Sequence, residues 1–225
     1  HELDDENITS YLEQIADHKV YLTVPQRGLK KDMLDLAQKN LDAHLNQAEQ
    51  LAHEIMEQLE LEHPVRTIEC FDISHLQGTN MVAAMSYFKD GRPLKSNYRK
   101  FNIKTVVGID DFRAMKEVVG RRYKRLKEQV SEQGMDSSIF PDLIIIDGGA
   151  IQLDFAKQAL DELGLEIPMV GLAKKFEELY FIDRKEPARY DKKSAMMRTF
   201  IAARDEVHRF GITFHRQKRS KKAKE

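Results

Sequence analysis

The sequence predicts an α/β domain in which a mixed five-stranded sheet is flanked by helices and preceded by a long helix. Three observations lead to this prediction. Apolar runs of strand length come first with hairpin signals between them and later alternate with helical patterns. Two of these strands deliver an aspartate near their carboxyl ends. A stripe of apolar residues at three- and four-residue spacing covers about 30 residues before the first strand.

Length and composition indicate a globular protein. The 225 residues suffice for one large domain, alone or with an appendage, and 41% hydrophobic residues can form a substantial core. No apolar run reaches the roughly 18–20 residues of a membrane span, and no signal-peptide pattern is visible. The single cysteine, Cys70, excludes an internal disulfide and fits a reducing, cytoplasmic location.

Charge is distributed unevenly along the chain. Residues 1–63 hold 14 Asp/Glu and 5 Lys/Arg, a balance of −9, whereas residues 64–225 hold 23 and 31, a balance of +8. The cations gather in two sets. The first is Arg113, Lys116, Arg121, Arg122, Lys124, Arg125 and Lys127, with Tyr123 among them. The second is Arg204, Arg209, Arg216, Lys218, Arg219, Lys221, Lys222 and Lys224, with His215. Such sets favour a polyanion partner, with a solvated helix face or a flexible linker as the alternatives.

The N-terminal part contains few structural signals before its long helix. Residues 1–12 are acidic and are expected to fray, and residues 19–24 alternate as a short strand or an extended segment would. The apolar stripe then predicts a helix over residues 29–62, which Pro64 ends. About 30 residues of helix span roughly 45 Å, so it is expected to be an arm or a spacer.

Three strands are predicted next, at residues 67–73, 81–88 and 94–103. The second is apolar on both faces and therefore central, and the third is polar like an exposed edge. The Asp90-Gly91 pair between them is a hairpin turn signal, so the three strands are expected to form an antiparallel meander.

The remaining chain alternates helices and strands. The predicted elements are a helix at 112–132, a strand at 142–147, a helix at 150–163, a strand at 169–172, an extended piece at 178–183 and a helix from 194 to 210 or beyond. Right-handed crossovers set the later strands parallel to the first. The simplest closed arrangement places strand four beside strand one, which is the ribonuclease H-like topology, in the order β-β-β-α-β-α-β-α.

This topology brings Asp72 and Asp147 to neighbouring strands. Adjacent strands lie about 4.8 Å apart, and two carboxylates at that spacing suit Mg²⁺ or Mn²⁺, ions that support phosphodiester cleavage. Asp147 could instead end its strand and cap the next helix, whereas Asp72 in mid-strand has fewer structural explanations. Asp110 and Asp111 are more often caps than ligands. No P-loop or GxGxxG pattern is present, so no nucleotide cofactor is indicated.

The last predicted helix adds a possible third ligand. His208 follows Arg204 by about one turn, so the two residues share a helix face. An isolated helical histidine is usually structural, but this helix is expected to pack near the edge of the aspartate site.

Several short motifs follow one another along the chain: FDISH at 71–75, DDF at 110–112, VGRRY at 119–123, IDGG at 146–149, GLAK at 171–174 and RDEVHRF at 204–210, with VPQRG at 24–28 before them. In this order they resemble the UvrC family, the excision nuclease subunit of bacterial nucleotide excision repair. Each motif alone is weak, but the series covers nearly the whole chain.

The resemblance implies an endonuclease half that cuts 5′ to a lesion in damaged double-stranded DNA, together with UvrB and with UvrA acting upstream. It implies a divalent-metal site made by Asp72, Asp147 and His208, with Asp111 as a further position implicated in activity. DNA contacts are expected from the basic and aromatic residues of these motifs and of the tail. Those residues are Arg121, Arg122, Tyr123, Lys174, Arg204, Arg209, Arg216, Lys218 and Arg219.

The chain also departs from the family pattern. Gly148 and Gly149 are often followed by Lys-Gly in the family, but here Ala150 and Ile151 follow. The GIY-YIG domain, the UvrB-binding motif and the helix-hairpin-helix module are missing, so a fragment is expected. Its expected parts are an N-terminal segment (1–63), an endonuclease domain (64–215) and a basic linker (216–225).

Two alternatives stay open. One is a non-catalytic DNA-binding module of the same fold. The other is a different ribonuclease H-like nuclease such as endonuclease V, against which the paired aspartates and the RDEVHRF helix favour UvrC.

Overall fold

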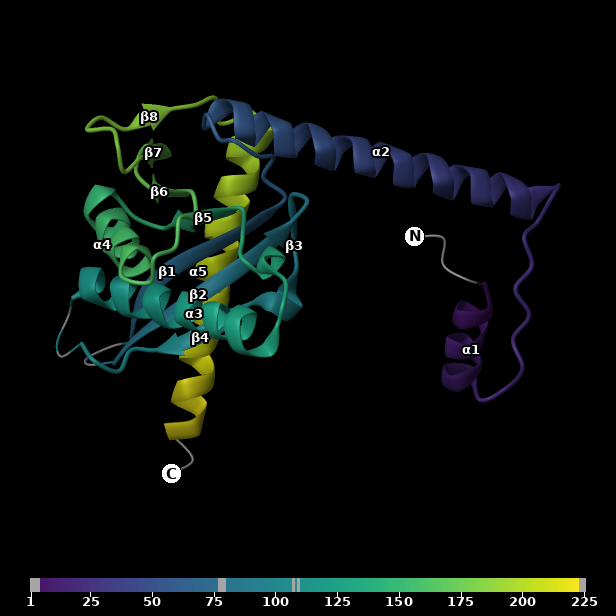
Figure 1. Ribbon diagram of the computed structural model, residues 1–225, viewed down its shortest axis with the longest axis horizontal. Helices are drawn as coiled ribbons and strands as arrows, with labels where there is room; N and C mark the ends of the chain where they lie inside the picture. The colour runs from purple at the N-terminus through teal and green to yellow at the C-terminus, as the bar shows by residue number, and fades with distance from the viewer. Residues whose placement is uncertain (1–4, 77–79, 107, 109, 223–225) are drawn as a thin grey trace. The chain divides into compact units, whose positions relative to one another are not determined.

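The computed structural model describes residues 5–76, 80–106, 108 and 110–222, without the side chains of residues 5–7, 75, 76, 80 and 214–222 (Figure 1). The chain divides into two compact units, His1–Gln47 and Ala48–Glu225. The division falls inside a long helix, α2 (Leu29–Gln58). Among the described residues, none of the helices combines the length and the apolarity that crossing a bilayer requires.

The first unit differs from the sequence prediction in two places. Helix α1 covers Asp5–Ala16, where fraying was expected, because Ile8, Leu12 and Ile15 recur at helical spacing. Of the two alternatives predicted for residues 19–24, a short strand or an extended segment, the strand is wrong: this segment has no strand pairing, and its apolar side chains Tyr21, Leu22 and Val24 are exposed. Alternation alone cannot make a strand without a neighbour to bond.

The second unit is built on one mixed sheet of eight strands. The strands are β1 (Thr67–Leu76), β2 (Asn80–Lys89), β3 (Arg92–Pro93), β4 (Arg99–Asn102), β5 (Leu143–Ile146), β6 (Met169–Ala173), β7 (Glu178–Tyr180) and β8 (Ala188–Arg189). Their order is β3-β2-β1-β5-β6-β7-β8, and β4 also pairs with β2. Strands β1 and β2 are antiparallel, whereas β1, β5 and β6 are parallel. The ribonuclease H-like arrangement, with strand four of the prediction beside strand one, is confirmed.

The edges of the sheet are where the five-stranded prediction is wrong. Of the single strand expected at 94–103, only β4 is strand, because a 3₁₀ turn occupies Lys95–Asn97, and a further short strand, β3, precedes the expected one. Pro93 lacks the N–H that would continue the ladder, and the chain turns directly after it. Of the extended piece at 178–183, only Glu178–Tyr180 is strand, and it pairs with the two-residue β8.

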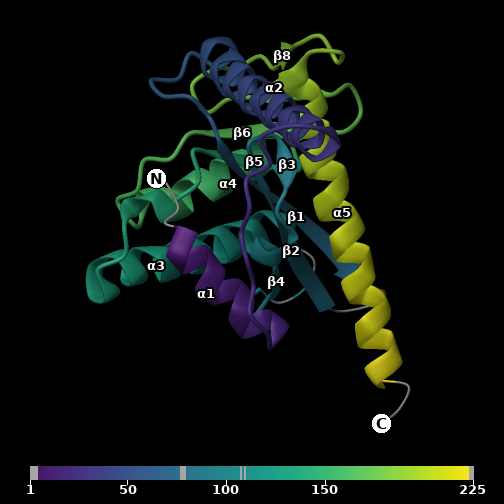
Figure 2. The same ribbon diagram turned by 90° about the vertical axis from the view of Figure 1, so that its right-hand side faces the viewer.

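Helices cover both faces of the sheet. Helices α3 (Asp111–Gln133) and α4 (Ala150–Asp161) lie on one face, and α5 (Ala195–Lys222) lies along the other (Figures 1 and 2). The α5 side has one apolar cluster, which includes Met196 and Phe200 and the α2 residue Ile55, and the α3 side has another. The strand alternation divides β1 between them.

A buried ion pair joins α3 to the central strand. Glu69 of β1 has no exposed surface, and its carboxylate accepts hydrogen bonds from Arg122 Nη2 at 2.5 Å and from Tyr123 Oη at 2.8 Å. Arg122 and Tyr123 stand next to each other on α3. A buried carboxylate requires such partners, because an isolated buried charge is strongly unfavourable.

We expect Arg122→Ala to lower the free energy of unfolding by about 3 kcal/mol, because it leaves the charge of Glu69 buried without its cation. Arg125→Ala, on an exposed position of the same helix, serves as the matched control and should change stability by less than about 0.5 kcal/mol. Urea denaturation measures both variants. Equal stability of the two variants would contradict the structural role of the pair.

Candidate metal centre

Strand register places the two aspartates side by side. Phe71 of β1 is paired with Ile146 of β5, and each of these two residues is followed by an aspartate, Asp72 or Asp147. The backbone N–H of Asp147 donates to the carbonyl of Phe71 at 2.9 Å, which extends the parallel ladder to this point. Side chains alternate between the two faces along a strand, so Asp72 lies on the same face of the sheet as Cys70, the face that α5 covers.

Helix α5 brings an imidazole to the same place. Val207 is buried in the core, and its neighbour His208 lies at the helix margin, with 47% of its side chain exposed. His208 Nδ1 lies 3.5 Å from Asp72 Oδ2. Gly211, about one turn later, allows this approach, because a Cβ there would lie 3.2 Å from Ser74 Oγ.

The three side chains offer a metal-binding group. One ligand atom each from Asp72, Asp147 and His208 lies within 4.8 Å of the others, and this is the one such group in the described part of the chain. Two carboxylates and an imidazole suit a divalent ion such as Mg²⁺ or Mn²⁺, whose remaining positions water or substrate can fill. The donor set thus fits the metal that the sequence predicts.

The site has too much negative charge for its surroundings. Burial and the neighbouring charge of Asp72 raise the pKa of Asp147 to about 6. Burial also raises the pKa of Asp72, although Ser74 Oγ donates to it at 2.8 Å and His208 favours its ionised form. A cation between the two carboxylates would remove their repulsion and favour the ionised form of both.

Arg204 and the β6–β7 loop support the centre from one side. Only 5% of the Arg204 side chain is exposed, and its guanidinium binds the carboxylates of Glu177 and, at 2.9 Å, Asp205. Its positive charge acts on Asp147 and favours the ionised form. Gly171 of β6 permits the close passage of the loop after Asp147, because a Cβ at 171 would lie 2.8 Å from the carbonyl oxygen of Gly148.

Asp111 lies at the start of a helix. It is the first residue of α3, and Asp110 is the N-cap, since its Oδ1 accepts from the backbone N–H of Arg113 at 3.0 Å. The group of three possible ligands does not include Asp111.

The expected DNA-contacting residues fall into three sets. Arg122, Tyr123 and Arg204 face inward onto carboxylates, and Arg121 binds Glu117 at 2.9 Å and the carbonyl of Asn102 at 2.7 Å. Lys174 and Arg209 are exposed, and Arg209 pairs with Glu206 at 2.6 Å. The side chains of Arg216, Lys218 and Arg219 lie outside the described residues, although α5 includes their backbone.

Sequence reasoning missed Ser74, Glu177 and Gly211. Ser74 could have been found, because it stands two residues after Asp72 and therefore shares its side of the strand. The contacts of Glu177 and Gly211 depend on how α5 crosses the sheet, for which the sequence carries no local signal.

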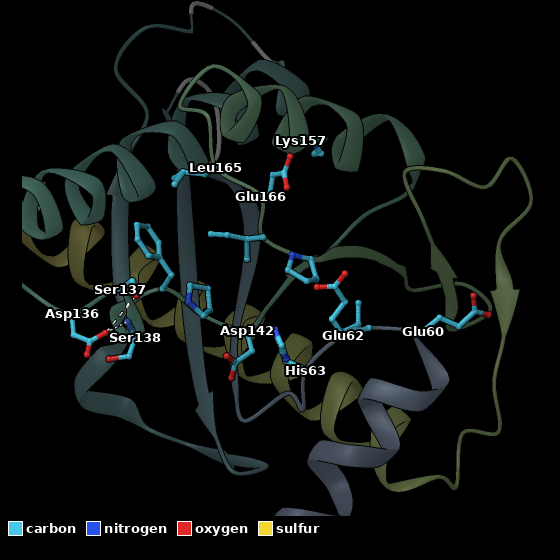
Figure 3. A pocket seen from close by; sticks show the side chains of 15 residues that line it. Glu60, Glu62, His63, Asp136, Ser137, Ser138, Asp142, Lys157, Leu165 and Glu166 are labelled. Carbon is cyan, nitrogen blue, oxygen red and sulfur yellow. Dashed lines mark hydrogen bonds between the residues drawn. The ribbon is translucent and has the colours of Figure 1, made fainter.

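A cavity of about 970 Å³ opens at the opposite edge, where the parallel strands begin (Figure 3). Its acidic residues include Asp136 and Asp142, whose carboxylates have structural tasks. Asp142 Oδ2 accepts from the backbone N–H groups of Arg66 and Thr67 at 2.9 and 2.8 Å, and Asp136 caps a 3₁₀ turn through Ser138. The carboxylates of Asp136 and Asp142 therefore hold the backbone at this cavity in place.

We expect Asp147→Asn to stabilise the metal-free protein by about 2 kcal/mol at pH 8. The folded-state pKa of Asp147, about 6, lies above its ordinary value of 3.8. The contribution of Asp147 to the free energy of unfolding therefore falls as the pH rises from the lower to the higher of these two values, and it stays at its reduced level at higher pH. The gain should therefore vanish below about pH 4.

Chemical denaturation at pH 8 and pH 4 in a chelating buffer measures this effect. Asp154→Asn, on an exposed position of α4, is the control and should leave stability unchanged at both pH values. Destabilisation by Asp147→Asn at pH 8 would contradict the repulsion described for the two carboxylates.

Comparison with known proteins identifies the family. The family described as "UvrC RNAse H endonuclease domain" matches residues 56–212, and that described as "UvrC Ribonuclease H-like domain" matches residues 1–48. Among solved structures, endonuclease V from Ciona intestinalis bound to inosine-containing DNA has a TM-score of 0.35 and 13% identity, covering 49% of this chain and 46% of that one. Human endonuclease V has a TM-score of 0.32 and 10% identity, covering 65% and 86%. Structural similarities with TM-scores this low support no conclusion about this chain.

Curated relatives are much more similar. UvrABC system protein C of Cytophaga hutchinsonii is 47% identical over 213 residues, covering 90% of this chain and 35% of that protein. The proteins of the same name from Flavobacterium johnsoniae and Methanospirillum hungatei are 48% and 44% identical, covering 89% and 96% of this chain and 35% and 40% of their own lengths. This chain spans about a third of the length of the first of these relatives. With its ribonuclease H-like sheet and a family match over residues 56–212, the chain belongs to the UvrC family.

Proposed function

We propose that this chain is the metal-dependent endonuclease part of a UvrC protein, which hydrolyses a phosphodiester bond 5′ to a lesion during nucleotide excision repair. The observation that supports it most is the grouping of Asp72, Asp147 and His208, within 4.8 Å of one another, in a chain of this family. The group lies at the carboxyl ends of parallel strands, where open α/β sheets commonly bind their ligands.

The residues of the centre have distinct roles in this proposal. Asp72 and Asp147 hold Mg²⁺ or Mn²⁺, and the Ser74 hydroxyl fixes the orientation of Asp72. When bound, the metal supplies Lewis acidity, which activates water and offsets charge on the phosphate. His208 completes the ligand set or moves a proton at Nδ1 or Nε2, a role that its half-exposed position permits.

Damaged double-stranded DNA is the proposed substrate, with UvrB as the partner that presents it and UvrA acting upstream. The curated name of the relatives, UvrABC system protein C, supports this assignment. The excess of Lys and Arg after residue 63 supports a polyanion substrate as well. Residues 64–215 are the proposed catalytic domain, between an N-terminal segment (1–63) and a basic link (216–225).

A non-catalytic DNA-binding module is the less favoured alternative. Such a module needs cations at its surface but has no use for two adjacent carboxylates in a largely buried position. The raised pKa of Asp147 indicates that this arrangement costs stability in the absence of a cation. Residues kept at such a cost are more often functional than structural.

We expect Asp72→Asn in the full-length protein to reduce the rate of 5′ nicking on the order of a thousandfold, because a metal ligand is lost. The assay uses lesion-bearing duplex, the UvrB–DNA complex and Mg²⁺ or Mn²⁺. Asp154→Asn, exposed on α4, is the control and should nick at the wild-type rate. Nicking by Asp72→Asn at the wild-type rate would exclude the proposed metal centre.

A further inference from the structure

The loop between β6 and β7, residues 174–177, presents an exposed aromatic ring beside the metal centre. Phe176 has 51% of its surface exposed. The loop is a tight turn, in which Glu177 adopts a left-handed conformation (φ 58°) and donates its N–H to the carbonyl of Ala173 at 3.1 Å. The ring is therefore carried on a defined turn.

The loop is fastened to the elements of the centre. The carboxylate of Glu177 binds Arg204, which precedes His208 by about one helical turn. Lys174 is close enough for its charge to favour the ionised forms of both Asp72 and Asp147. Whatever occupies the metal centre therefore lies within reach of this loop.

Two cations flank the exposed ring. Lys175 Nζ lies 5.1 Å and the guanidinium carbon of Arg189 lies 5.4 Å from the centroid of Phe176. Arg189, on β8, is held in place by Glu178, whose Oε1 accepts from its Nε at 2.8 Å. A solvent-facing aromatic ring with cations beside it matches the surfaces that bind unpaired nucleic acid, where bases stack and phosphates meet positive charge.

We propose that Phe176 stacks on an unpaired base of the DNA next to the phosphate held at the metal centre, while Lys175 and Arg189 contact adjoining phosphates. This inference rests on the proposed function and adds a preference to it: the substrate is locally unpaired at the cleavage site. In intact duplex the bases are already stacked on one another, so the ring gains its contact only where pairing is broken.

The sequence offers a clean probe of this contact. The chain has no tryptophan, so Phe176→Trp gives a single tryptophan, at the loop, whose fluorescence can be excited selectively. The 225-residue chain is titrated, in a chelating buffer that prevents cleavage, with an oligonucleotide duplex containing an unpaired bubble, with the fully paired duplex and with polyphosphate. We expect the bubble DNA to quench the tryptophan and polyphosphate, which has no bases, to leave it unchanged.

Tyr21→Trp is the matched control. Tyr21 is also an exposed ring with a cation beside it, since Lys19 Nζ lies 5.8 Å from its centroid, but it belongs to the first unit. Its tryptophan should not respond to the bubble DNA. Equal quenching at both positions, quenching of Phe176→Trp by polyphosphate, or no response of Phe176→Trp to any DNA would overturn the proposal.

A second measurement tests the energetic contribution. Phe176→Ala should weaken binding of the bubble DNA roughly tenfold and leave binding of the paired duplex unchanged. Unchanged affinity for the bubble DNA would overturn the stacking contact. Because both measurements are made without metal, they are independent of nicking. Failure of the proposed endonuclease would instead be seen as wild-type nicking by Asp72→Asn.

Discussion

The repulsion between two buried carboxylates is the constraint on which the centre depends. Parallel pairing of β1 with β5 fixes Asp72 and Asp147 next to each other, and burial removes the water that would screen them. The surrounding chain offsets this cost only in part, through the Ser74 hydroxyl and the charges of Arg204 and His208. The negative charge that is left uncompensated would favour the binding of a divalent cation between the two carboxylates.

Strand β1 shows two ways to accommodate a carboxylate in a sheet. Glu69, on the α3 side, is neutralised by Arg122 and by the Tyr123 hydroxyl, so it joins helix and sheet and has no capacity left for a ligand. Asp72, three residues later on the α5 side, has an imidazole and a hydroxyl but, among the described side chains, no arginine or lysine within ion-pair distance. The difference in partners, rather than in burial, separates the structural acid Glu69 from the proposed metal ligand Asp72.

Much of the fold and of the candidate metal centre could be predicted from the sequence, for physical reasons. Crossover handedness and the apolar runs placed Asp72 and Asp147 on adjoining parallel strands, and the expected position of the last helix, together with the family resemblance, indicated His208. The inward direction of Arg122 and Arg204 could not be read, because a run of cations does not state which face each side chain takes. The two-residue strands β3 and β8 escaped prediction because so short a segment has no periodicity of its own.

The group of Asp72, Asp147 and His208 should bind a divalent ion in competition with protons. The most direct test is calorimetric titration of the 225-residue chain with Mn²⁺ between pH 8 and pH 5. Because the pKa of Asp147 is about 6, Mn²⁺ affinity should fall at least tenfold per pH unit below that pH, with each further ligand that takes up a proton making the fall steeper. Absence of Mn²⁺ binding at pH 8, or binding that Asp72→Asn leaves unchanged, would contradict the central claim.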